Sequence, residues 1–184
     1  MEILKEMCSI HSPSGEEKEI KNFILNYIDN NQSKWNKKPV IFHGDNFQDN
    51  LILVFGKPTT AIFAHMDSIG FTVRYNNEII KIGGPITNDG IVLVGRDSKG
   101  IIEGKIINKD KKLYIDFNRH IDRGTSLVFK PNFREDKDFI QSCYLDNRLG
   151  VYSALEVAKT LENGIIVFSS WEEHKGGTAG YLGK

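Results

Sequence analysis

Histidine and acidic residues stand just after apolar runs in this sequence, where their side chains could share one site. His65 and Asp67 follow the run Ala61–Ala64. Because residues i and i+2 of an extended segment face the same way, the two side chains are expected to project together. A carboxylate beside an imidazole fixes the tautomer of the ring and leaves the other nitrogen free to bind a metal. The alternative for this pair alone is a hydrogen-bonded structural histidine.

A second acidic position, Asp146, lies in the stretch Leu145–Arg148 at the start of a predicted helix. Aspartate is a common N-cap, because its carboxylate accepts hydrogen bonds from the free backbone N–H groups of the first turn. The functional alternative is a carboxylate that bridges two cations, with one oxygen on each. Taken alone, this stretch allows both interpretations.

A third motif, Glu172 with Glu173, comes shortly after the apolar run Ile165–Phe168. Two adjacent carboxylates at a strand end cost free energy unless they are solvated or bound to something positive. Neighbouring side chains of an extended chain point apart, so one carboxylate can ligate a metal while the other accepts a proton from water. An exposed acidic loop is the alternative.

The elements that must position these motifs follow an α/β pattern. Apolar spacing predicts helices near the N-terminus, one of which contains Ile20 to Ile28 and begins with a capping box of Ser14 and Glu17. The other predicted elements are three buried strands and a helix, at Leu51–Phe55, Ala61–Ala64, Ile165–Phe168 and about Leu149–Leu161. Open α/β sheets place their active sites at the carboxyl ends of strands, and all three motifs lie at or just beyond such ends.

Between about residues 72 and 138 the pattern changes to short β-rich runs separated by glycines. The runs are Glu78–Ile82, Ile91–Val94, Ile101–Ile107, Lys112–Phe117 and Ser126–Phe129. This pattern is typical of a small all-β barrel or sandwich. We therefore predict an α/β domain of residues 1–71 and 139–184, interrupted by a β-rich domain of residues 72–138. The insertion contains no motif residue and has many strand edges to cover, so we expect it to mediate self-association rather than contact the reacting bond.

The composition argues against several kinds of partner. The 184 residues include 24 Lys+Arg and 24 Asp+Glu, so no net charge attracts nucleic acid or an anionic membrane. No segment approaches the roughly 20 apolar residues that a membrane-spanning helix needs, and we identify no signal peptide. Cys8 and Cys143 are expected to be reduced thiols, which favours a cytoplasmic location.

Taken together, the three motifs resemble those of a known family. His65-x-Asp67, Leu145–Arg148 and Glu172-Glu173 occur in the order of the co-catalytic metalloaminopeptidases, and they most resemble the glutamyl-aminopeptidase and tetrahedral-aminopeptidase family. Residues 11–17 and 124–129 are similar to that family's N-terminal helix entry and to its sequence around the insertion. In this family a PDZ-like domain lies before the paired glutamates, whereas related carboxypeptidase and deacylase families place the extra domain after them. The resemblance implies an α/β, mixed-sheet, zinc-peptidase-like domain with a PDZ-like insertion.

The resemblance also implies a role for each motif residue. His65 would be a ligand of one metal, Glu173 a ligand of the other, and Asp146 the bridge between them. Glu172 would be the general base, and Asp67 would orient the ring of His65. Two divalent ions with mixed histidine and carboxylate ligands suit Zn²⁺, Co²⁺ or Mn²⁺. The implied activity is an aminopeptidase that releases N-terminal amino acids from peptides with a metal-activated water.

The family's site also needs an Asp and a His that lie C-terminal to the paired glutamates. His11, His43 and His120 lie outside the motifs and are not expected to replace them. The chain is therefore expected to be a fragment, to be completed by another polypeptide or to be inactive, and alone to bind metal poorly. Two other functions stay open, a carboxypeptidase or N-deacylase of the same superfamily and a non-catalytic peptide-binding or assembly module. The expected partners are a peptide substrate and further copies of the chain, bound through the insertion.

Overall fold

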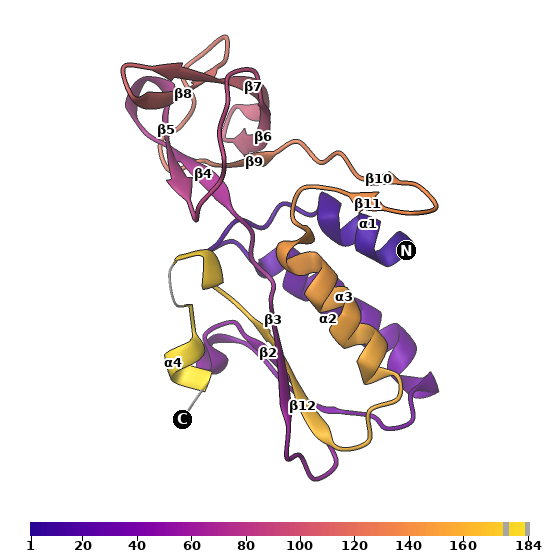
Figure 1. The fold of residues 1–184 in the computed structure, drawn as a ribbon. Helices are drawn as coiled ribbons and strands as arrows, with labels where there is room; N and C mark the ends of the chain where they lie inside the picture. The colour runs from indigo at the N-terminus through magenta and orange to yellow at the C-terminus, as the bar shows by residue number, and fades with distance from the viewer. Residues whose placement is uncertain (175–176, 183–184) are drawn as a thin grey trace.

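A mixed four-stranded sheet forms the centre of the α/β part (Figure 1). The computed structural model describes residues 1–174 and 177–182 of the chain. The order β1-β2-β12-β3 is formed by β1 (Val40–Phe42), β2 (Leu51–Phe55), β12 (Gly164–Ser169) and β3 (Ala61–His65). Strand β12 pairs antiparallel with β2 and parallel with β3, and Ser169 is the partner of His65. The last residues of β12 and β3 therefore lie side by side.

Three helices cover one face of this sheet. They are α1 (Glu2–Ser9), α2 (Lys18–Asn31) and α3 (Leu145–Ala158), and Figure 1 shows them on the same side. Strand β2 alternates between side chains that are fully buried and side chains that are partly exposed, because successive residues point to opposite faces. Its buried set, Leu51, Leu53 and Phe55, packs with the apolar faces of the helices into one core. None of the described helices is long and apolar enough to cross a membrane.

Residues 70–129 fold into a closed six-stranded barrel with the order β4-β5-β8-β7-β6-β9. Its strands are β4 (Gly70–Val73), β5 (Glu78–Ile82), β6 (Val92–Asp97), β7 (Gly100–Lys109), β8 (Lys112–Asp116) and β9 (Ser126–Phe129). All neighbours are antiparallel, and β4 pairs with both β5 and β9. The predicted small all-β unit is confirmed, and of the two forms the sequence allowed it is the barrel. Its likeness to a PDZ domain and the domain boundaries at residues 72 and 138 stay predictions.

Because the barrel is closed, uncovered strand edges cannot be the reason for self-association, as the sequence had suggested. Self-association was expected because short strands leave edges that need covering, but a closed barrel pairs each of its six strands on both sides. The barrel core is apolar, and its most deeply buried members include Phe71, Leu93 and Leu127. Any association through this part of the chain therefore has to use side chains on its outer surface.

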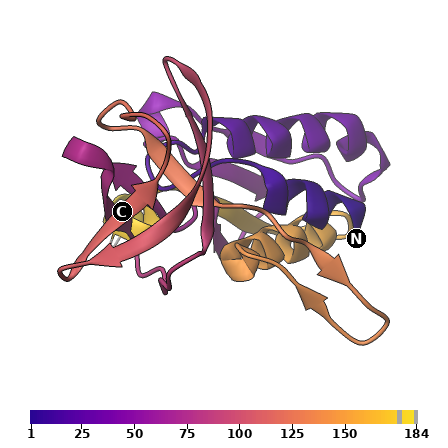
Figure 2. The ribbon, with the colours of Figure 1, turned by 90° about the horizontal axis from the view of Figure 1, so that it is seen from above.

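The other described elements are short connections. They are η1 (Gln32–Lys34), η2 (Asp45–Phe47), η3 (Tyr75–Asn77), η4 (Glu172–His174), β10 (Arg134–Glu135), β11 (Ile140–Gln141) and α4 (Ala179–Leu182). β10 and β11 pair in a hairpin between the barrel and α3, which Figure 2 shows on the helical side of the α/β part. Helix α3 starts at Leu145 rather than near Leu149 as predicted, but the backbone at Asp146 and Asn147 is not helical. The thiols of Cys8 and Cys143 are both free.

Candidate metal centre

The three sequence motifs meet at the edge of the sheet where β3 and β12 end. His65 is the last residue of β3, and its partner Ser169 is the last residue of β12. Parallel neighbours end at the same edge, so the residues that follow each strand also come together. Asp67 follows β3 by two residues, and Glu172 and Glu173 form the short helix η4 after β12. Helix α3 brings Asp146 to the same place from its first turn.

The distances describe one compact cluster. Nε2 of His65 lies 3.0 Å from Oδ1 of Asp146, which is 81 residues away in the chain. The same nitrogen lies 3.8 Å from Oε2 of Glu172. One potential ligand atom from each of His65, Glu172 and Glu173 lies within 4.8 Å of the other two. The structure thus brings together all four side chains that were predicted to bind metal or accept a proton, while their individual roles stay a proposal.

Asp67 contacts both the end of β3 and the loop that follows β12. Its side chain is fully buried, and Oδ1 lies 3.5 Å from Nδ1 of His65. Its two oxygens also accept hydrogen bonds from the backbone N–H groups of Glu172, at 3.1 Å, and Glu173, at 2.9 Å. Burial by itself raises the pKa of Asp67, but the interaction with His65 and then the hydrogen bonds from the two backbone N–H groups outweigh it and lower that pKa. Asp67 is therefore held as an anion that positions the glutamate-bearing loop as well as the histidine.

The carboxylates also control the protonation of His65. Burial by itself lowers the pKa of the imidazole, but Asp67, Asp146 and Glu172 outweigh this effect and raise it from 6.5 to about 9. In the metal-free protein His65 is therefore positively charged near neutral pH. Since a metal binds the neutral imidazole, a cation that binds here has to replace this proton.

The donor set fits a divalent cation. Burial raises the pKa of Glu173, and the nearby charges of Glu172, Asp67 and Asp146 raise it further, whereas His65 opposes the shift. Within residues 1–174 and 177–182, no lysine or arginine forms an ion pair with Asp146, Glu172 or Glu173. Bound positive charge would relieve this repulsion. One imidazole nitrogen with several carboxylate oxygens suits Zn²⁺, Co²⁺ or Mn²⁺ better than soft metals that prefer thiolates.

Arg148 links two of the three motifs, a role that the sequence did not reveal. Its side chain is fully buried in the α/β core. Nε donates to the carbonyl of Met7 at 3.2 Å, and the terminal nitrogens donate to the carbonyl of Met66 and to Oγ of Ser12. Met66 lies between the two residues of the His-x-Asp motif, so this one side chain ties α3 to the end of β3. Burial lowers the pKa of the guanidinium to about 10, which leaves it charged at neutral pH.

Glu17 also has a role other than the predicted one. In the sequence it was assigned to a capping box with Ser14, but the start of α2 has no side-chain cap. Instead, Oε1 of Glu17 accepts hydrogen bonds from the backbone N–H groups of Gly15, at 2.9 Å, and Trp171, at 3.0 Å. Trp171 directly precedes the paired glutamates and has a positive φ of 65°. Glu17 therefore ties the start of the glutamate-bearing loop to the N-terminal segment.

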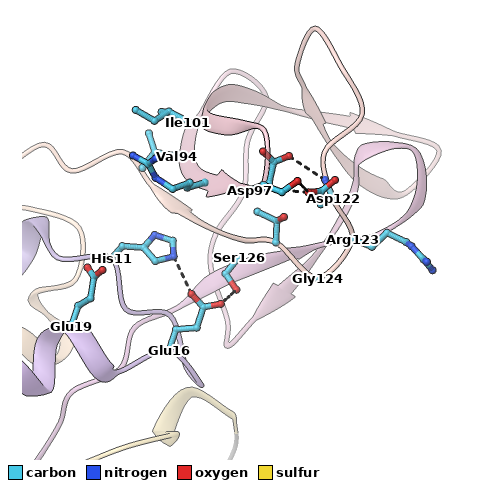
Figure 3. A pocket seen from close by; sticks show the side chains of 14 residues that line it. His11, Glu16, Glu19, Val94, Asp97, Ile101, Asp122, Arg123, Gly124 and Ser126 are labelled. Atoms are coloured by element: carbon cyan, nitrogen blue, oxygen red, sulfur yellow. Dashed lines mark hydrogen bonds and ion pairs between the residues drawn. The ribbon is translucent and has the colours of Figure 1, made fainter.

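A separate cavity of about 700 Å³ lies where the barrel meets the N-terminal segment (Figure 3). None of the five predicted site residues lines it. Nε2 of His11 lies 3.4 Å from Oε2 of Glu16, and Oγ of Ser126 donates to Oε1 of the same carboxylate at 2.6 Å. These contacts join the barrel to the α/β part, and they occupy the His11 side chain outside the metal-ligand cluster.

Comparison with solved structures identifies a shared fold. The chain is similar to PhTET1-12s, a dodecamer (TM-score 0.77, 24% identity, 95% of this chain and 61% of that chain). It is similar to the TET1 peptidase of Pyrococcus horikoshii (TM-score 0.74, 24% identity, 95% and 62%). It is also similar to the aminopeptidase APDkam598 of the archaeon Desulfurococcus kamchatkensis (TM-score 0.77, 23% identity, 96% and 57%).

These similarities concern the arrangement of the elements. No protein-family model matches the sequence, and neither does any curated protein. The chain spans about three fifths of the length of the solved structures that it matches. At these identities the comparison shows that the chain has the fold of that part of a TET-type peptidase.

Proposed function

We propose that this chain forms part of a metal-dependent aminopeptidase with two divalent cations at the strand ends of its α/β sheet. The observation that carries the proposal is the convergence of His65, Asp146 and the paired glutamates, which come from three distant segments. The names of proteins with a similar fold, an aminopeptidase and TET peptidases, support the same reaction class.

The exposure and contacts of the side chains support the proposed roles. Asp146 has a side chain that is 88% exposed and reaches His65, as suits a ligand that can bridge two cations. Glu173 is the less exposed glutamate and is assigned as a ligand of one cation, with His65 as a ligand of the other. Glu172, which is 57% exposed, is assigned as the base that accepts a proton from water. Bound Zn²⁺, Co²⁺ or Mn²⁺ would polarise the scissile carbonyl and make water more acidic. Asp67 keeps the histidine and both glutamates in place.

The proposed partners are a peptide substrate and further copies of the chain. The matched proteins include a dodecamer and a peptidase that assembles into a tetrahedron or an octahedral shell. In this chain the outer barrel surface exposes Ile80, Ile101 and Ile107, by 49%, 70% and 40%. We propose these side chains as part of an association surface, and the cytoplasm, where thiols remain reduced, as the location.

The test compares three glutamate-to-glutamine variants of the protein expressed from its complete gene. Glu173→Gln should lose metal and activity together. Glu172→Gln should keep its metal and lose turnover by roughly 10²–10⁴-fold, the range for removal of a positioned base. Glu162→Gln is the matched control, because Glu162 is exposed and lies before the opposite end of β12.

Metal content and hydrolysis of aminoacyl anilides are measured on the same samples. Loss of metal in Glu172→Gln would contradict the division of roles between the two glutamates. Hydrolysis of N-acyl amino acids in place of free-amine substrates would indicate a carboxypeptidase or deacylase. A wild-type protein that binds no metal would indicate a non-catalytic module.

A further inference from the structure

We propose that Gly83, which belongs to the barrel, is a positioning residue for Glu173 in the metal centre. The inference rests on the proposed function, since it treats Glu173 as a metal ligand. It assigns the barrel a part in building the centre, although the barrel contains none of the motif residues.

The observation is a close approach between two parts of the chain that are far apart in sequence. Gly83 directly follows β5 and has a φ of +74°. A Cβ added at Gly83 would lie 2.6 Å from Oε2 and 3.4 Å from Cβ of Glu173. It would also lie 2.8 Å from Cγ2 of Ile69. Contacts below 3.0 Å overlap, so any side chain at this position has to displace the carboxylate, Ile69 or the barrel strand.

Glu173 is confined from two sides as a result. Its backbone N–H donates to the buried carboxylate of Asp67 at 2.9 Å, which fixes the main chain at the strand end. Its carboxylate then lies against the bare backbone of Gly83. With its main chain fixed and one side closed by the barrel, the carboxylate is held near His65 and Glu172. Preorganised ligands of this kind bind a metal more tightly than mobile ones.

Two other glycines of the same loop serve as comparisons, because a glycine at position 83 could be needed for its positive φ or for the space that a Cβ would fill. Gly84 has open space around an added Cβ, and its φ is not in the left-handed region. Gly90 has a φ of +86° but also has open space. A substitution at Gly90 therefore introduces backbone strain alone, and one at Gly84 introduces neither strain nor overlap. A substitution at Gly83 introduces strain together with overlap on Glu173 and Ile69.

The experiment compares Gly83→Ala, Gly84→Ala and Gly90→Ala in the protein expressed from its complete gene. Titration with Co²⁺ gives the dissociation constant, and the visible spectrum of bound Co²⁺ reports its coordination. We expect Gly83→Ala to weaken Co²⁺ binding at least tenfold and to change the spectrum. Gly90→Ala should lower the melting temperature but keep the wild-type spectrum and affinity, and Gly84→Ala should change neither. Equal Co²⁺ affinities and spectra for Gly83→Ala and Gly90→Ala would overturn the proposal.

A second measurement, made in EDTA, does not depend on metal binding. Melting temperatures of Gly83→Ala, Glu173→Ala and the double variant form a double-mutant cycle. Once Glu173 is truncated, Gly83→Ala should cost clearly less than it does beside the intact glutamate, because only the backbone strain and the contact with Ile69 remain. Additive effects would overturn the proposal, even if the wild-type protein bound no Co²⁺ and the proposed function failed.

The cycle also covers a variant that does not fold. If Gly83→Ala is unfolded and Gly83→Ala with Glu173→Ala folds, the overlap with the carboxylate is the cause, which supports the proposal. If neither folds, strain or the contact with Ile69 is the cause, and Glu173 is not the partner that requires a glycine.

Discussion

The α/β part and the barrel bury different kinds of side chain. The buried polar and charged residues of the described chain lie outside residues 70–129, and they include Glu17, Asp67 and Arg148. The barrel core is a cluster of aliphatic and aromatic residues. The barrel's nearest counterpart to Arg148 is Asp97, a half-buried residue whose carboxylate accepts two hydrogen bonds, of 2.6 and 2.8 Å, from the guanidinium of Arg119.

This difference corresponds to what each part has to achieve. An apolar core tolerates side chains of similar size, because its attraction has no direction. A buried polar network tolerates little, because each donor or acceptor that loses its partner stays desolvated. The buried network of the α/β part therefore holds the side chains of the candidate metal centre at fixed positions, whereas the barrel core is held by packing without such a network. The difference can be tested by substitution in each part.

The largest effect is expected for Arg148→Met. The substitution removes the hydrogen bonds to the carbonyls of Met7 and Met66 and to the hydroxyl of Ser12. Leaving buried polar groups unpaired costs about 1–3 kcal/mol each, so we expect a loss of at least about 3 kcal/mol in the free energy of unfolding. Urea unfolding measures it, with Arg134→Met on the exposed hairpin as the control. A loss below about 1 kcal/mol would mean that the network does not stabilise the α/β part.

A smaller effect is expected from pH in the metal-free protein. Because the pKa of His65 is raised from 6.5 to about 9, its protonated form stabilises the fold. This stabilisation is fully present below pH 6.5 and is lost as the pH rises through about 9. At 1.36 kcal/mol per unit it amounts to at most about 3 kcal/mol.

Tryptophan fluorescence during urea unfolding in EDTA can measure this pH dependence in the α/β part, which contains His65. Both tryptophans, Trp35 and Trp171, lie outside the barrel. His65→Gln should abolish the decline between pH 6.5 and 9, and His43→Gln, at an exposed position, should retain it. Identical pH profiles for the wild type and His65→Gln would show that the imidazole does not carry this stabilisation.

The smallest effect is expected at the charged pair of the barrel. Arg119→Gln removes the partner of Asp97, whose pKa Arg119 holds well below its usual range. Because the barrel core does not depend on this pair, the melting temperature should fall by a few degrees only. Lys130→Gln, which breaks an exposed pair with Glu103, should have even less effect. A fall as large as that of Arg148→Met would remove the distinction between the two parts.

The sequence predicted the features that depend on local pattern. The strands that end at His65 and Ser169 follow from the apolar runs Ala61–Ala64 and Ile165–Phe168. Their parallel pairing, which the structure adds, brings the motifs to one edge of the sheet. The β-rich unit follows from its short runs and glycines. In both cases the signal lies within a few neighbouring residues.

The features that escaped prediction depend on contacts between distant segments. Nothing in the sequence near Arg148 distinguishes a buried guanidinium from an exposed one, because its partners at Ser12 and Met66 lie more than 80 residues away. Glu17 has the spacing of a capping box, but its carboxylate accepts a hydrogen bond from the backbone N–H of Trp171, which lies 154 residues later. Gly83 resembles an ordinary turn glycine until Glu173 is placed against it. Closure of the barrel likewise depends on the pairing of β4 with β9.

The parallel register of β12 and β3 limits how the chain can change in length. Deleting one residue within β12 would shift the following residues, including Glu172 and Glu173, by about 3.3 Å relative to β3. The side chains of β12 beyond the deletion would then point to the opposite face of the sheet. The same deletion at Asp110, in the exposed turn between β7 and β8, would shorten a loop tip alone. Descendants of this chain can therefore vary the length of the turn between β7 and β8, whereas β3 and β12 can change only by substitution.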